Sequence, residues 1–207
     1  MCAVLSFDAS NKQRFMPPIP SVTKAFMLAC VGVYCLFYLV PGLQPWFELW
    51  PLQSGNFYPW QVVSYAFLHG GELHLFFNML GLWMFGSELE RVWGPKRYLQ
   101  ILMASTLSAA AVQLIFTALM NSNAPTVGAS GALFGLLLSF GMLFPDRVIV
   151  PLFPPIPMKA KYFVAIFGAL ELLMGLGGST GVAHFAHLGG MLGAYLLIRY
   201  WRTSRRR

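Results

Sequence analysis

Two residues of this sequence have the side chains that nucleophilic catalysis needs. Ser130 lies among small residues in the segment GASG at 128–131, and His187 follows much later in the chain. A serine hydroxyl is a weak nucleophile until a neighbouring base takes its proton, and histidine is the usual base because its pKa is close to neutral. The pair therefore predicts acyl transfer, provided that the fold brings the two side chains together.

A tetrahedral intermediate also needs hydrogen-bond donors around its oxyanion. The nucleophile is expected to open a helix, where its own backbone N–H is free at the positive end of the helix dipole. His74 and Asn78, four residues apart, would share one helix face and add two side-chain donors. Gly128 lets a peptide backbone approach the oxyanion site, while Gly131 and Gly190 allow the two catalytic helices to touch.

The composition indicates where these residues are held. Hydrophobic residues make up 57% of the 207 positions and charged residues only 10%, whereas a soluble domain has about 25% charged residues. The apolar residues form long uncharged runs, which predict an all-α membrane protein with six spans, several of them shorter than the ~20 residues that usually cross a bilayer. The predicted spans are Lys24–Val40, Leu73–Leu89, Tyr98–Met120, Ser130–Phe144, Ala160–Gly175 and His187–Tyr200.

The basic residues predict how the spans are oriented. All 14 Lys and Arg residues lie in the N-terminal segment, the loops after the second and fourth spans, and the C-terminal tail. Basic residues accumulate on the cytoplasmic side of spans, so both termini are predicted to be cytoplasmic. The net charge of +7 then marks topology and not a nucleic-acid surface. This gives a cytoplasmic segment at 1–23, a six-helix domain at 24–201 and a basic cytoplasmic tail at 202–207.

This topology brings polar residues to one depth. The second, fourth and sixth spans run in the same direction, so their N-terminal ends all lie near the outer face. Those ends hold Ser130 and Asn78. All four histidines also lie within those ends or just before them. Strongly polar groups are costly in a membrane and usually mark a functional site.

None of the seven acidic residues is predicted to orient His187. Four of them belong to the inner side of this topology, and Glu48 and Glu72 lie in an outer loop. Glu171 is expected deep in the fifth span. A catalytic triad normally has a third, acidic member, so we expect a Ser–His dyad instead.

Other interpretations of the same residues stay open. A serine flanked by glycines often only permits close helix packing, and a single histidine near the interface can be a polar residue reaching for water. His184 and His187, three residues apart, could bind zinc in a transporter or other metal-binding membrane protein. Against that interpretation, the sequence has no HExxH motif and no carboxylate or thiolate ligand predicted at that depth.

The motifs together resemble those of the rhomboid intramembrane proteases. The matching segments are HGGELHLFFN at 69–78, ELERVWG at 88–94, GASG at 128–131 and AHFAHLGG at 183–190. The resemblance covers nearly the whole chain from Lys24 onward, with six spans in the right order. It also leaves open a rhomboid-like protein that binds helices without cutting them, although such proteins usually lack the nucleophile or the base.

The resemblance implies an intramembrane serine endopeptidase that cleaves transmembrane helices of other proteins near the outer face, surrounded by lipid, without metal or cofactor. It implies that Ser130 is the nucleophile, that His187 is the general base, and that His74 and Asn78 assist the oxyanion. Phe134 stands where the family often has a tyrosine that packs on the catalytic histidine. A Trp60–Gln61 pair replaces the family's Trp–Arg pair, which puts the anchoring of the first loop in doubt. The compact chain without a transit peptide suggests a bacterial cytoplasmic membrane.

Overall fold

The computed structural model describes residues 18–152, 154–177 and 183–204, and these residues form a helical bundle with one short β-hairpin. The helices are α1 (Ser21–Leu39), α2 (Gln61–Ser64), α3 (Glu72–Gly81), α4 (Ser87–Leu119), α5 (Ser130–Leu143), α6 (Ala160–Gly177) and α7 (His184–Ser204). The strands are β1 (Val148–Ile149) and β2 (Met158–Lys159). The predicted all-α fold is therefore correct apart from this hairpin, whose two-residue strands are too short to give a sequence pattern.

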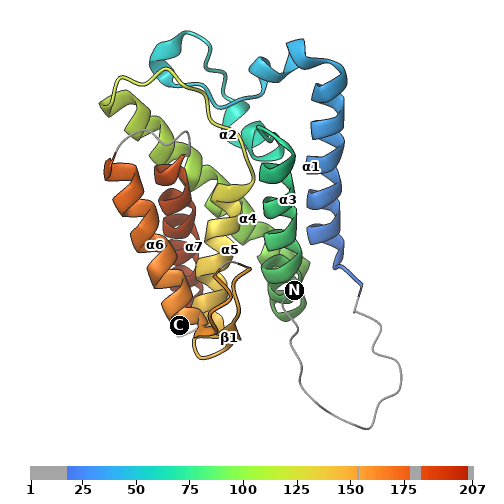
Figure 1. The fold of residues 1–207 in the computed structure, drawn as a ribbon, viewed down its shortest axis with the longest axis vertical. Coiled ribbons are helices and arrows are strands. Elements are labelled where there is room, and N and C mark those ends of the chain that lie inside the picture. The colour runs from blue at the N-terminus through green and yellow to red at the C-terminus, as the bar shows by residue number, and fades with distance from the viewer. Residues whose placement is uncertain (1–17, 153, 178–182, 205–207) are drawn as a thin grey trace.

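The helices stand side by side, with α1 at one edge of the bundle and α6 at the other (Figure 1). α7 makes its most extensive contacts with α4 and α5. α1 begins and α7 ends at the same end of the bundle, while the long connection between α1 and α3 lies at the opposite end (Figure 1). The predicted domain boundaries at 23 and 202 fall close to these helix ends, and residues 1–17 and 205–207 lie outside the described residues.

Each of the six predicted spans is helical, with limits that differ by a few residues. α3 continues through a π-helical turn at Leu82–Gly86 into α4, so the second and third spans form one helical stretch. That stretch is interrupted at Gly94, whose φ of 75° and ψ of 167° break the helix just before Pro95. Glycine adopts this conformation without steric cost, and proline cannot continue the preceding turn. The chain therefore reverses at Gly94-Pro95, a dipeptide that favours a break in a helix.

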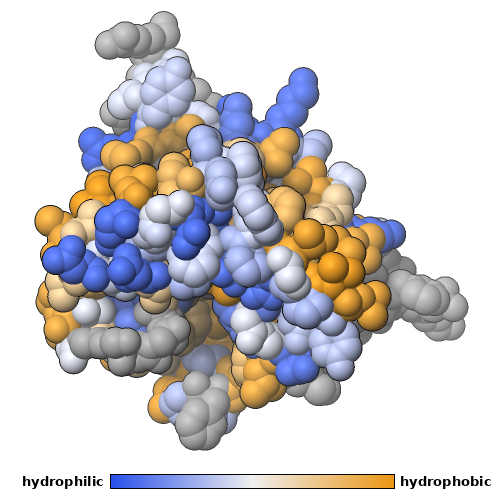
Figure 2. Space-filling view, turned by 90° about the horizontal axis from the view of Figure 1, so that it is seen from above, coloured by the Kyte–Doolittle hydropathy of each residue, from blue (hydrophilic) through white to orange (hydrophobic). Residues whose placement is uncertain are grey.

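Three helical stretches of the described chain are long and apolar enough to cross a membrane, namely Ser21–Leu39, Glu72–Leu119 and Ala160–Gly177. Ser130–Leu143 is apolar but shorter. Seen from the end that carries the long connection, hydrophilic residues gather near the middle of the surface and hydrophobic residues lie towards its edges (Figure 2). This distribution fits a bundle surrounded by lipid and open to water at its ends.

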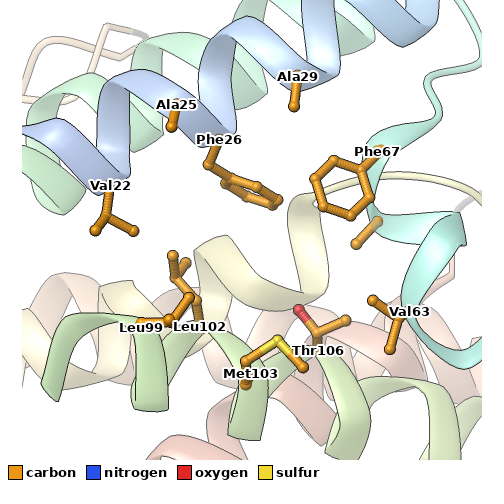
Figure 3. A pocket seen from close by; sticks show the side chains of 11 residues that line it. Val22, Ala25, Phe26, Ala29, Val63, Phe67, Leu99, Leu102, Met103 and Thr106 are labelled. Atoms are coloured by element: carbon orange, nitrogen blue, oxygen red, sulfur yellow. The ribbon is translucent and has the colours of Figure 1, made fainter. Parts of the chain in front are cut away.

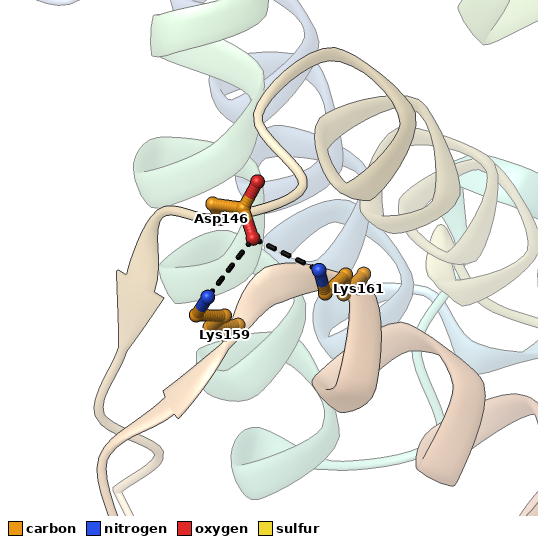
Figure 4. A network of polar contacts seen from close by, with 3 residues as sticks. All are labelled: Asp146, Lys159 and Lys161. Atoms are coloured by element: carbon orange, nitrogen blue, oxygen red, sulfur yellow. Dashed lines mark hydrogen bonds and ion pairs between the residues drawn. The ribbon is translucent and has the colours of Figure 1, made fainter.

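The hairpin lies at the end of the bundle where α5 passes into α6. Asp146 lies in the turn between α5 and β1, and its Oδ1 accepts hydrogen bonds from Lys161 at 2.9 Å and Lys159 at 3.1 Å (Figure 4). The bond from Lys161, followed by that from Lys159, holds the pKa of the Asp146 carboxyl below its usual range. Arg147 pairs with Glu88 of α4 at 2.6 Å. The connection between α5 and α6 thus places Arg147, Lys159 and Lys161 at the end of the bundle where α1 begins (Figure 1).

α1 packs loosely along most of its length. An apolar cavity of about 270 Å³ separates it from α4 (Figure 3). Val22 and Phe26 of α1 face Leu102 and Met103 of α4 across this space. Of the 19 residues of α1, only Thr23, Cys30 and Phe37 are buried.

The first turn of α1 is held by a carboxylate from another helix. Glu90 of α4 is buried, and its Oε2 accepts hydrogen bonds from the backbone N–H of Thr23 at 2.7 Å and from its hydroxyl at 2.8 Å. Its Oε1 accepts the N–H of Val22 at 2.9 Å and lies 3.3 Å from the hydroxyl of Ser21. A helix N-terminus has N–H groups without intrahelical partners and favours negative charge. Glu90 therefore caps α1 across the bundle.

We expect Glu90→Ala to lower the free energy of unfolding by about 3 kcal/mol, because it leaves buried N–H groups without acceptors. Thermal unfolding in detergent micelles measures the loss. Glu88→Ala is the matched control, since its ion pair with Arg147 is over a third exposed on each side and such pairs contribute less than about 1 kcal/mol. Equal losses in the two variants would contradict the capping role.

Candidate active site

The structure brings the two predicted catalytic side chains into direct contact. Nε2 of His187 lies 2.8 Å from Oγ of Ser130, although the residues are 57 positions apart. Ser130 is the first residue of α5 and His187 is in the first turn of α7. The distance is that of a hydrogen bond in which the hydroxyl donates and the imidazole accepts. This is the arrangement by which a histidine activates a serine.

Glycines allow α5 and α7 to approach closely enough for that contact. A Cβ added at Gly190 would overlap the carbonyl oxygen of Gly131. A Cβ at Gly131 would lie 2.6 Å from Cβ of Ala109 in α4 and 3.6 Å from the carbonyl oxygen of Ala186. Gly131 and Gly190 therefore lie where the helices touch, and any side chain there would push the helices apart.

The predicted oxyanion residues Gly128 and His74 lie next to Ser130. Gly128 has a φ of +128°, a conformation that favours glycine. A Cβ there would lie 2.8 Å from both Cε1 and Nε2 of His74 and 3.5 Å from Oγ of Ser130. Nδ1 of His74 accepts the backbone N–H of Gly70 at 3.4 Å, which assigns the ring proton to Nε2. His74 can thus donate from Nε2 on the Gly128 side of the site.

Asn78 lies on the same face of α3 and is buried. Its Nδ2 donates to the carbonyl oxygen of His74 at 2.8 Å, within its own helix. Among the described residues, its Oδ1 has no hydrogen-bond partner. A side-chain amide has two N–H donors, so one N–H of Asn78 is used to hold its side chain along the helix and the other is free for a ligand.

Phe134 stacks on the ring of His187. The ring centroids of Phe134 and His187 are 4.2 Å apart, and the planes differ by 6°. Phe134 lies one helical turn after Ser130 on α5, which places its ring below the Ser130 side chain. The stack restricts the rotation of the imidazole, so the orientation of its nitrogens is set by packing on one face.

One expectation was wrong: an acidic residue does reach His187. Oε2 of Glu171 lies 2.8 Å from Nδ1 of His187 and 2.6 Å from Nδ1 of His184. The sequence predicted that Glu171 lies too deep in the fifth span to reach His187. Glu171 lies only six residues before Gly177, roughly 9 Å along a helix axis, and His187 lies three residues after the start of α7. Both side chains are therefore near the same end of the bundle, and the rotation of the two helices brings them into contact.

The cluster also supplies the carboxylate that the metal-binding interpretation lacked. The ligand atoms of Glu171, His184 and His187 all lie within 4.8 Å of one another. Two histidines and a glutamate are a common ligand set for catalytic zinc. The prediction that the histidines have no carboxylate ligand at their depth was therefore also wrong.

The fourth histidine, His69, packs against His74. His69 is buried in the turn before α3, and its ring packs edge-on against His74 with centroids 5.1 Å apart. Burial, followed by the proximity of His74, lowers the pKa of His69 to about 4. His69 is therefore neutral near pH 7 and contacts the oxyanion side of the site through His74.

Tyr65 holds the segment that leads into the nucleophile, a role that no sequence motif indicated. Its carbonyl oxygen accepts the N–H of Gly128 at 2.9 Å, and its hydroxyl donates to the carbonyl oxygen of Thr106 at 2.9 Å. Nearby, Leu49 and Thr126 exchange two backbone hydrogen bonds of 3.0 Å. The long connection between α1 and α3 is therefore tied to the residues that precede Ser130.

The same connection is well anchored in spite of its unusual Trp60–Gln61 pair. Gln61 is fully buried. Its Oε1 accepts the N–H of Trp50 at 3.2 Å, and its Nε2 donates to the carbonyl oxygens of Asn56 at 3.0 Å and Trp46 at 3.3 Å. Nε1 of Trp60 donates to the carbonyl oxygen of Trp46 at 2.9 Å. The doubt about loop anchoring is removed, because the amide of Gln61 bonds three points of the loop.

Comparison with known proteins identifies a family for this chain. The family model described as the Rhomboid domain matches residues 56–203. RHOMBOID-like protein 4 of Arabidopsis thaliana is 36% identical over 145 residues, which cover 68% of this chain and 34% of that protein. Rhomboid protease GlpG of Yersinia pestis (strain Pestoides F) is 29% identical over 188 residues, which cover 88% of this chain and 63% of that protein.

The chain therefore spans less than two thirds of the length of these relatives. The matched segment nevertheless contains both members of the Ser130–His187 contact, the two polar residues of α3 and the stacked phenylalanine. With a family match that covers most of the sequence, and with apolar helices long enough to cross a bilayer, this chain is an integral membrane protein of the rhomboid family.

Proposed function

We propose that this protein is an intramembrane serine endopeptidase that cleaves transmembrane helices of other membrane proteins near the outer face. The observation that carries the proposal is the 2.8 Å contact between Oγ of Ser130 and Nε2 of His187. It joins the first turns of two helices that the predicted topology directs from the outer face inward. A buried imidazole that accepts from a serine at a helix N-terminus is suited to acyl transfer.

The proposed topology has six spans with both termini in the cytoplasm, and the membrane is proposed to be a bacterial cytoplasmic membrane. In its support, α1 begins and α7 ends at the same end of the bundle (Figure 1), and the basic residues of the inner loops lie at that end. The catalytic pair lies towards the other end, with the connection between α1 and α3. No nucleic acid is proposed as a partner, since the positive charge is accounted for by orientation.

In the proposed reaction, Oγ of Ser130 attacks the carbonyl carbon of the scissile peptide bond while Nε2 of His187 takes the hydroxyl proton. The oxyanion is stabilised by the backbone N–H of Ser130 and by the side chains of His74 and Asn78, with Gly128 leaving room for the peptide. The C–N bond then breaks, and His187 gives the proton to the leaving amine. Water hydrolyses the acyl-enzyme by the same steps, with His187 again as base. Every step uses side chains of this protein, and no cofactor is proposed.

The test is cleavage of a single-span reporter protein by purified wild type and Ser130→Ala, each with and without a metal chelator. We expect product from the wild type regardless of chelator and none from Ser130→Ala. A fluorophosphonate, which reacts with activated serines, should label the wild type and not the variant. Cleavage by Ser130→Ala that the chelator abolishes would overturn the proposal in favour of metal chemistry, and absence of both cleavage and labelling in the wild type would favour a helix-binding protein.

A further inference from the structure

We propose that Glu171 is a positioning residue for His187, so that the reaction proposed above uses a chain of three groups. The inference rests on that proposed function and adds one acidic residue to it. Oγ of Ser130 is 2.8 Å from Nε2 of His187, and Nδ1 of the same ring is 2.8 Å from Oε2 of Glu171. The carboxylate and the nucleophile therefore lie at the two nitrogens of one imidazole.

Burial makes this carboxylate effective. The Glu171 side chain is 13% exposed and that of His187 is 9% exposed. α6 is otherwise apolar along the turn that carries Glu171, with leucines on both sides in the sequence. A charge at such a position is stable only when it is paired, so Glu171 is held to its histidine partners.

The position of the carboxylate sets which nitrogen of His187 carries the proton. A carboxylate accepts hydrogen bonds and does not donate them, so it favours the form with the proton on Nδ1. The lone pair then stays on Nε2, where Ser130 delivers its proton. The approach to Nδ1 is oblique, because the distance is short but Oε2 lies off the N–H direction. We therefore expect a smaller contribution than that of an aligned aspartate in a soluble protease.

His184 completes the arrangement by fixing Glu171 itself. Its Nδ1 lies 2.6 Å from the same Oε2, the shorter of the two contacts. His184 is buried and lies one turn before His187 on α7. The carboxylate is thus held between two histidines of one helix face, while Phe134 stacks on the ring of His187. His187 is restricted both at Nδ1 and on one ring face.

The distances favour a proton over a metal ion between these groups. A tetrahedral zinc ion bound at about 2.0–2.2 Å would hold its ligand atoms roughly 3.3 Å apart. The observed separations of 2.6 and 2.8 Å are shorter than that, and the contact of His184 is a hydrogen bond. A cation on Nδ1 of His187 would also leave the ring proton on Nε2, where it would prevent that nitrogen from accepting the proton of Ser130.

The test compares Glu171→Gln, Glu171→Asp and the matched control Glu48→Gln, which alters an outer carboxylate bound by Gln44. We expect Glu171→Gln to lower kcat by about 10²-fold, the scale of a misplaced catalytic group, with KM within threefold and an unchanged melting temperature. Fluorophosphonate labelling should slow in parallel, because it reports on the nucleophile without substrate docking. Glu171→Asp, which keeps the charge, should recover at least tenfold, and Glu48→Gln should match the wild type.

Three results would overturn this assignment. The first is a Glu171→Gln variant with wild-type kcat while Ser130→Ala is inactive, and the second is a loss confined to KM or to the melting temperature, which would reduce Glu171 to a structural contact between α6 and α7. Both leave the proposed function untouched. The third is wild-type cleavage that a chelator abolishes and zinc restores, while cleavage by Glu171→Gln responds to neither; the carboxylate would then hold a metal, and the metal-free reaction proposed above would fail as well. If Ser130→Ala cleaves as well as the wild type, the proposed function itself fails.

Discussion

Ser130→Ala, His187→Ala and the double variant should all fall to the same residual rate. We expect each to lower kcat by about 10⁶-fold, as when the serine or the histidine of a protease is removed. The reason is the single hydrogen bond between Oγ and Nε2. Without the base the hydroxyl keeps its proton, and without the hydroxyl the base has nothing to activate. Removing the second partner therefore costs nothing further.

The measurement is single-turnover cleavage of the reporter substrate at saturating enzyme, which separates chemistry from substrate binding. Ser139→Ala is the matched control, because it makes the same substitution in a buried serine of the same helix, whose hydroxyl donates to the carbonyl oxygen of Gly135 at 2.8 Å. It should retain wild-type kcat. Losses that multiply in the double variant would mean that the two residues act independently, and the activation mechanism would be wrong.

Gly190→Ala should damage both stability and catalysis. The added methyl group would overlap the carbonyl oxygen of Gly131, which is backbone and cannot turn aside. Relief requires α5 and α7 to separate, at a cost of about 1–3 kcal/mol for overpacking. A shift of about 1 Å between catalytic groups can lower the rate by about 10²-fold. We expect a lower melting temperature together with a loss of kcat near that size.

Gly32→Ala provides the control for this prediction. Gly32 lies in α1, and a Cβ there would meet nothing within 4 Å. Alanine is more favourable than glycine in a helix by up to about 1 kcal/mol, so this variant should be as stable as the wild type or slightly more stable. Wild-type kcat in Gly190→Ala would show that the helices can repack without disturbing the catalytic pair.

The contact between Ser130 and His187 was predictable because it depends mainly on helix direction. Once three spans run the same way, their N-terminal residues lie at one depth, and small residues on the facing helices let His74, Ser130 and His187 come near one another. The bends were predictable where glycine and proline determine the backbone, as at Gly94-Pro95. These inferences used only the hydrophobic pattern and local chemistry.

Glu171 was missed for a different reason. Its distance from His187 depends on where two helices end and how they are rotated, and a span predicted only to within a few residues does not determine either. Gln61 and Tyr65 act through hydrogen bonds to backbone groups of distant segments, which leave no periodic trace in the sequence. Contacts of this kind depend on tertiary packing, and a single sequence does not contain a signal for them.

The carboxylate of Glu90 has a consequence for how the protein is made. α1 leaves the ribosome before α4, but the acceptor for the N–H groups of its first turn is 67 and 68 residues further along the chain. Until α4 has been synthesised and has docked, that turn must bond to water at the membrane surface. α1 can therefore enter the bilayer early yet reach its final place late. The loose packing of α1 beside the cavity is consistent with this order, in which the other helices assemble around α4 first and α1 docks against them afterwards.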